Sequence, residues 1–160
     1  MKNTNEPSKG NPYTKFILML ALSFVAMYIT MFLNTYKMDH VYFSLTRFYM
    51  TCLGISAMAV IMFAVMRKMY QNQKKNIAIL VGSVVLFLGA LGLVRAQSPI
   101  IGDILYMEGM IPHHSIAILT SERAAIKDPE VRKLADGIIE AQKKEIAEMK
   151  EMLKRLKNKN

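Results

Sequence analysis

Cysteine is almost absent from this sequence, and that limits the chemistry available to it. The single cysteine, Cys52, lies within a long uncharged run, where a lone thiol most often acts as a small hydrophobic side chain. One cysteine cannot form a disulfide within the chain. Residues 96–160 contain no cysteine, which excludes a structural zinc site built from thiolates in that part of the sequence.

Formal charge is also absent from three long apolar runs. They cover residues 16–33, 48–66 and 77–94, each of 18 or 19 residues. A helix of that length reaches about 27–29 Å, close to the thickness of a bilayer's hydrocarbon core. We therefore predict three transmembrane helices. Because the runs lack the ionisable groups that mark ion pathways, we expect an anchor and not a transporter. The third run also contains small residues that predict close helix packing, namely Gly82, Gly89 and Gly92, with Ser83 and Ala90 adding small surface.

The basic residues around these runs predict their orientation. Three spans place the N-terminal tail and the second loop on the same side of the membrane. That side carries Lys2, Lys9, Lys15, Arg67, Lys68, Lys74 and Lys75, whereas the first loop carries Lys37 and Arg47. By the positive-inside rule, the N-terminus is cytoplasmic and everything after the third span is extracytoplasmic.

This interpretation divides the chain into three parts. Residues 1–14 form a flexible cytoplasmic tail, residues 15–95 form the membrane domain, and residues 96–160 form an external domain. The external domain begins after a short hinge and contains two predicted helices, the first from about Asp103 to Ile126. The second has a clear start, with Asp128 as N-cap and Pro129 in the first turn, and continues to about Leu156. We predict an antiparallel helical hairpin.

The segment MEGMIPHH at residues 107–114 concentrates side chains that bind metals. Two of the three histidines are adjacent there, and two methionines precede them. Imidazole and thioether groups together suit soft or borderline transition metals, copper above all. On the second predicted helix Gln142 and Glu145 fall on the apolar face, where a charge is costly without a partner.

Folding the hairpin about residues 127–128 places polar positions of the two helices at the same height. The predicted pairs are His114 with residues 141–142, Met110 with residues 145–146, and Met107 with Met149. We therefore predict a metal site for copper or silver. Its candidate ligands are His113, His114, Met110, Met107, Glu145, Met149 and Gln142.

Several of these residues have a simpler interpretation. His114 is also compatible with a core histidine hydrogen-bonded to Gln142 or Glu145. His113 points about 100° away from His114 on a regular helix, so it belongs to the same site only if Pro112 bends the helix, or it serves a second subunit. Glu145 is a ligand, a partner that orients His114, or a member of a buried ion pair. A second small group, Met38, Asp39 and His40, is either loop surface or an accessory ligand set.

The two predicted helices carry a motif that resembles a known bacterial family. The motif reads Asp103-x2-Tyr106-x3-Met110-Ile111-Pro112-His113-His114-x2-Ala117, then Asp128-Pro129-x2-Arg132-x-Leu134-Ala135-x2-Ile138-Ile139-x2-Gln142-x2-Glu145-Ile146-x2-Met149. Over residues 103–156 the chain resembles the domain of unknown function 305. The three-span anchor lies outside the resemblance.

The resemblance implies a ferritin-like helical fold, an extracytoplasmic setting and, for some members, copper binding with a role in metal tolerance. Together with the three predicted spans, it predicts a protein of the bacterial cytoplasmic membrane. By motif matching it assigns the site to His113, His114, Met110, Gln142, Glu145 and Met149. The sequence departs from many members after the histidine pair, where Leu119 and Thr120 replace a methionine. That departure removes one soft ligand.

We therefore predict an all-α membrane protein: three transmembrane helices, then an extracytoplasmic ferritin-like hairpin completed to a four-helix bundle by dimerisation. Its predicted function is the capture or buffering of copper, or silver, for metal tolerance. The alternative is a non-metal oligomerisation or sensory module whose polar seam sets the helix register. The predicted partners are the lipid bilayer, the metal ion and a second copy.

Two further functions are not expected from these residues. Di-iron chemistry normally uses Glu-x-x-His pairs, but positions 110 and 111 are Met and Ile, and no nucleophile–base arrangement indicates another enzyme. Nucleic acid is not an expected partner either, because the basic residues of the hairpin have no aromatic residues between them.

Overall fold

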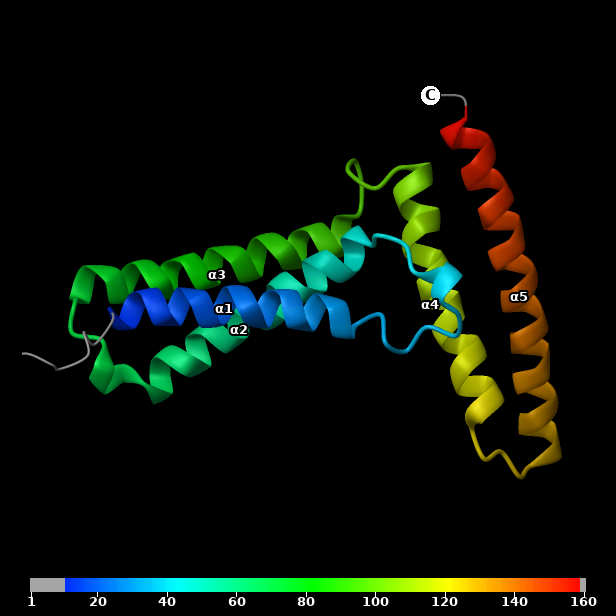
Figure 1. Ribbon diagram of the computed structural model, residues 1–160, viewed down its shortest axis with the longest axis horizontal. Coiled ribbons are helices and arrows are strands. Elements are labelled where there is room, and N and C mark those ends of the chain that lie inside the picture. Colours follow the sequence, from blue (N-terminus) through cyan, green and yellow to red (C-terminus); the bar gives the residue numbers. More distant parts are fainter. Residues whose placement is uncertain (1–10, 159–160) are drawn as a thin grey trace, which may run out of the picture.

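The computed structural model describes residues 11–158, and every regular element in that range is helical (Figure 1). The α-helices are α1 (Pro12–Thr30), α2 (Leu45–Val65), α3 (Gln73–Ala96), α4 (Asp103–Arg123) and α5 (Pro129–Lys157). Two short 3-10 turns, η1 (Met38–His40) and η2 (Arg67–Met69), lie in the loops between the first three helices. The predicted all-α class is confirmed for the described residues.

The first three helices are each long and apolar enough to cross a membrane. Each begins three or four residues before its uncharged run, because a polar side chain caps it there. Asn11, Ser44 and Asn72 each accept a hydrogen bond from a backbone N–H in the following turn. Residues 1–10 of the predicted tail lie outside the described residues. Of the rest of that tail, Asn11 is the N-cap and residues 12–14 are helical, not flexible coil.

Helix α2 packs against both α1 and α3 and crosses α1 obliquely (Figure 1). Ser83 and Ala90, seven residues apart, are the two buried side chains of α3. The predicted close packing at Gly82, Gly89 and Gly92 is wrong within this chain, since a methyl group added at any of them would meet no atom within 4 Å. Gly82 and Gly89 are rotated about 100° from the packed face, and Gly92 lies nearly opposite it.

Close approach occurs instead between α1 and α2. A Cβ added at Gly54 would lie 2.5 Å from the terminal carbon of Met27. Glycine therefore lets the Met27 side chain lie directly on the backbone of α2. The sequence gives no sign of this contact, because Gly54 is a single small residue without a repeated spacing.

Helices α4 and α5 form the antiparallel hairpin, which lies across one end of the three-helix bundle (Figure 1). The first helix ends at Arg123, three residues earlier than predicted, and residues 124–128 connect it to α5. Asp128 caps α5 as predicted, since its Oδ1 accepts hydrogen bonds from the backbone N–H groups of Glu130 and Val131. The seam of the hairpin is a cluster of buried side chains: Met107, Ile111, Ile118, Ile146, Met149 and Leu153.

The first loop, residues 31–44, holds the hairpin against the bundle. The fully buried hydroxyl of Ser115 accepts a hydrogen bond from the backbone N–H of Tyr36 at 2.7 Å. Arg47, at the start of α2, donates to the backbone carbonyls of Met31 and Pro112, the latter at 3.3 Å. These contacts join α4 to the end of the bundle through polar groups.

Candidate metal centre

His114 lies in the seam of the hairpin with both ring nitrogens in contact with oxygen atoms. Its Nε2 lies 2.7 Å from Oε2 of Glu145 on α5. Its Nδ1 lies 3.0 Å from the backbone carbonyl oxygen of Met110, one turn earlier on α4. The His114 side chain is 12% exposed and that of Glu145 is 50% exposed, so the pair lies at the edge of the core.

The chemistry of these contacts restricts what lies between the two side chains. A carbonyl oxygen and a carboxylate oxygen only accept hydrogen bonds, so a neutral imidazole can donate to only one of them. In the tautomer that donates from Nδ1 to Met110, the lone pair of Nε2 faces the carboxylate of Glu145. A proton or a metal cation between Nε2 and Oε2 removes that repulsion. A ring nitrogen fixed by a backbone carbonyl while the other faces the ligand is also how proteins orient metal-binding histidines.

His114 contacts α5 at Glu145, about one helical turn further from the α4–α5 connection than the predicted residues 141–142. The reason is the direction of side chains on a helix, which lean toward its N-terminus. The ring of His114 therefore leans away from the connection, and the carboxylate of Glu145 leans toward it. Their backbone positions are offset accordingly, and Glu145 replaces residues 141–142 as the partner.

The candidate methionines lie in and beside the apolar seam. Met107 and Met149 are buried in the same cluster, and Met110 packs against it half-buried. Met110 lies four residues before His114, and Met149 four residues after Glu145, so each thioether is one helical turn from one of the two polar groups.

The other two candidate ligands lie further from this contact. His113 is exposed, with its ring centroid 6.0 Å from that of His114 and the ring planes 66° apart. Gln142 is half-buried and lines an open groove on α5, together with Leu134 and Ile138. Within residues 11–158 no three His, Cys, Asp or Glu side chains gather closely enough to hold a metal ion. A metal ion at this contact would have two donors, His114 and Glu145, and would need a third from a thioether, from Gln142 or from another molecule.

His40 has a structural place that its sequence position did not predict. It is 7% exposed, and its Nδ1 lies 2.9 Å from the hydroxyl oxygen of Ser115. Burial lowers the pKa of the His40 imidazole, and the charges of Lys150 and Lys37 lower it further, while Asp39 acts in the opposite direction. The neighbouring Met38 is 85% exposed. Of the group Met38, Asp39 and His40, His40 is therefore part of the core, whereas Met38 lies at the surface.

Ion pairs surround the seam on its polar side. Lys150 Nζ lies 2.6 Å from Oδ2 of Asp39, and this hydrogen bond lowers the pKa of the Asp39 carboxyl. Lys157 pairs with Glu108 at 2.6 Å, from the last turn of α5 to the second turn of α4. These contacts place part of the hairpin's positive charge against carboxylates of α4 and of the first loop.

Comparison with known proteins gives two findings. The family described as "Domain of unknown function (DUF305)" matches residues 103–160, the part of the chain that contains α4 and α5. The "Uncharacterized protein L153" of Acanthamoeba polyphaga mimivirus is 35% identical over 148 residues, a match that covers 89% of this chain and 95% of the viral protein. No solved structure matches the chain.

Proposed function

We propose that this chain, which belongs to the same family as the mimivirus protein L153 and carries a DUF305 domain at residues 103–160, is a membrane-anchored protein that binds copper or silver. The hairpin binds the ion outside the membrane, where it captures or buffers the metal. Three helices able to cross a bilayer support the anchor, and the basic residues around them support an external hairpin.

One observation carries the proposal: the contact between His114 and Glu145. The ring is oriented through Nδ1 by the Met110 carbonyl, and Nε2 faces a carboxylate at 2.7 Å. A cation bound there would take the place of the proton between the two groups. The arrangement therefore offers one imidazole nitrogen and one carboxylate on two facing helices, with the imidazole already aligned.

Sulfur determines which metal fits this arrangement best. Met110 and Met149 each lie one turn from the polar pair, so their thioethers are the nearest soft donors along α4 and α5. Thioethers favour copper and silver over the hard cations magnesium and calcium. Gln142 adds an amide oxygen one turn before Glu145, and the exposed His113 is available to a second copy of the chain.

A second copy would also account for apolar surface on the hairpin. Val131, Leu134 and Ile138 of α5 are 49%, 65% and 37% exposed. Because two helices enclose little core, we propose that two hairpins associate through this face into a ferritin-like four-helix bundle. Such a dimer brings further ligands to a site that one hairpin supplies only in part.

The test is a metal titration of the purified full-length chain in detergent with Cu(I), Ag(I), Cu(II) and Zn(II). We expect stoichiometric binding of Cu(I) or Ag(I), and its loss in His114→Ala and in Glu145→Gln. Glu148→Gln is the matched control, since it removes an exposed carboxylate from the same helix outside the seam. His113→Ala separately measures whether the neighbouring histidine belongs to the site.

Failure of all four ions to bind, with the helices retained in circular dichroism, would exclude the metal function. The same conclusion follows if Glu148→Gln weakens binding as much as Glu145→Gln does, because the effect would then be one of general surface charge.

The same contact favours a second candidate function. As a hydrogen-bonded pair across the seam, His114 and Glu145 fix the register of α4 against α5 without any metal, which suits an oligomerisation or sensory module. In that case His114→Ala changes the oligomeric state of metal-free protein in analytical ultracentrifugation. A pure metal site leaves that state unchanged.

A further inference from the structure

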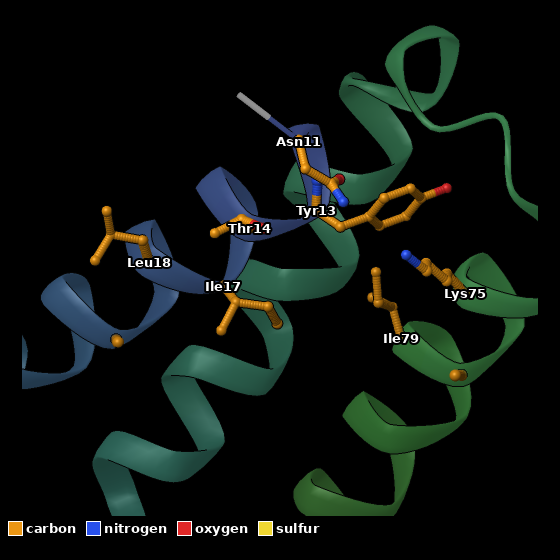
Figure 2. Close-up of a pocket in the computed structure, with 9 residues that line it drawn as sticks. Asn11, Tyr13, Thr14, Ile17, Leu18, Lys75 and Ile79 are labelled. Atoms are coloured by element: carbon orange, nitrogen blue, oxygen red, sulfur yellow. The ribbon is translucent and has the colours of Figure 1, made fainter. Parts of the chain in front are cut away.

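An apolar groove opens between α1 and α3 at the end of the bundle opposite the hairpin (Figures 1 and 2). It has a volume of about 630 Å³ and is lined by Asn11, Tyr13, Thr14, Ile17, Leu18, Ala21, Lys75, Ala78 and Ile79. The groove exists because α1 and α3 both pack on α2 and meet each other only near their first turns.

Tyr13 determines where the groove ends. Its hydroxyl donates to Oδ1 of Asn76 at 2.8 Å and accepts from the backbone N–H of Asn72 at 2.9 Å. These bonds hold the start of α1 against the start of α3. Beyond them the two helices are separated by apolar side chains from both walls, and Figure 2 shows Ile17 and Ile79 on opposite sides of the space.

The lining changes from polar to apolar along the groove. Asn11, Tyr13 and Lys75 lie at the outer end, where α1 and α3 begin. Ile17, Ala21 and Ala78 follow deeper along the helices. A phospholipid has the same order of groups along its length, with a polar head followed by acyl chains.

Charge at this end of the bundle is of one sign. The exposed basic residues here are Lys15, Arg67, Lys68, Lys74 and Lys75. Asp39 is the only acidic residue between positions 11 and 102, and it lies in the first loop at the opposite end, paired with Lys150. Glu6 lies outside the described residues. Lys75 lies inside the groove, with its Nζ 5.1 Å from the centroid of the Tyr13 ring.

We propose that this groove binds an anionic glycerophospholipid. One acyl chain lies between Ile17 and Ile79, and the phosphate lies at Lys75 and Asn11 at the outer end. The positive charge around the groove selects the anionic head, and the apolar walls hold the chain. An amphipathic occupant fits better than a second helix, because the lining changes within a few turns from charged to fully apolar.

Native mass spectrometry of the full-length chain in detergent tests this, with phosphatidylglycerol or phosphatidylcholine added in equal amounts. One lysine near a membrane surface contributes about a fivefold preference for anionic lipid, so Lys75→Gln is expected to lower phosphatidylglycerol binding by about that factor. Lys68→Gln is the matched control, since it removes the same charge from the same end without lining the groove. Ala78→Trp, which fills the apolar part, is expected to reduce the binding of both lipids.

Equal binding of the two lipids, or equal losses in Lys75→Gln and Lys68→Gln, would overturn the proposal in favour of diffuse attraction. Displacement of the lipid by inorganic phosphate at millimolar concentration would overturn it in favour of a free-anion site. A change of oligomeric state in Ala78→Trp, with lipid binding intact, would show that a second copy occupies the groove.

Discussion

At the scale of single residues, the two histidines in the interior are distinguished by their partners. His114 faces a carbonyl and a carboxylate, both of which only accept hydrogen bonds. His40 faces the hydroxyl of Ser115, which accepts from the backbone of Tyr36 and still has one hydrogen and one lone pair available to Nδ1. Burial lowers the pKa of the His40 ring and so favours its neutral form.

This difference predicts how stability depends on pH. The pKa of His40 is lowered in the folded chain, so below pH 6.5 the unfolded chain takes up the proton more readily. The stabilisation is present above about pH 6.5 and decreases as the pH falls from there toward the lowered pKa. We expect the midpoint of thermal unfolding in detergent to fall between pH 7.5 and about pH 5.5.

His40→Asn is the control for that measurement. Asparagine places a polar atom near the position of Nδ1 but does not titrate, so the decrease should be smaller in this variant. Identical pH dependence in both proteins would show that His40 does not contribute, and that the titration of other groups determines the decrease.

At the scale of elements, the sequence predicts the helices well and their ends less well. Asp128 and Pro129 start α5 as expected, because an N-cap followed by proline is a local signal. Helices α1 to α3 begin three or four residues before the predicted spans, because their capping residues lie outside the uncharged runs. The partner of His114 lies one turn beyond the predicted height, because side chains lean toward the N-terminus of their own helix.

Helix packing within the bundle of α1, α2 and α3 gives a prediction at this scale. Gly54→Leu forces a side chain against Met27 and is expected to destabilise the packing of α1 on α2 by about 1–3 kcal/mol. Gly89→Leu makes the same chemical change on α3, where no atom lies within 4 Å, and is expected to change stability by less than about 0.5 kcal/mol. Unfolding in a detergent titration with dodecyl sulfate measures both. A larger loss in Gly89→Leu would mean that a second chain packs on α3.

At the scale of the whole molecule, the position of the hairpin across the bundle was not predictable from periodicity. It depends on single polar contacts between distant segments: Arg47 with the Pro112 carbonyl, and Ser115 with residues 36 and 40. No local pattern distinguishes Arg47 from other loop charges, or Ser115 from other small polar residues of a helix. The candidate ligands were recognisable because they are unusual residue types, but whether two helices bring them together depends on geometry.

Membrane topology provides the prediction at this scale. In a Cys52→Ala background, Glu148→Cys on α5 is expected to react with a membrane-impermeant thiol reagent added to intact cells. Gln71→Cys, in the second loop, is expected to react only after the membrane is opened. Both positions are exposed in the structure, so accessibility to solvent does not separate them. The reverse pattern of labelling would show that the topology is inverted and that the hairpin lies in the cytoplasm.

The contact between Ser115 and the first loop has an evolutionary consequence. The DUF305 match begins at residue 103, but the buried hydroxyl of Ser115 is held by residues 36 and 40, which precede it. A recombination event that moved the hairpin alone would leave that hydroxyl without its partners. Loop and hairpin are therefore expected to be inherited together, and the match to the mimivirus relative extends over 89% of the chain. Lineages that replace Ser115 should replace His40 as well.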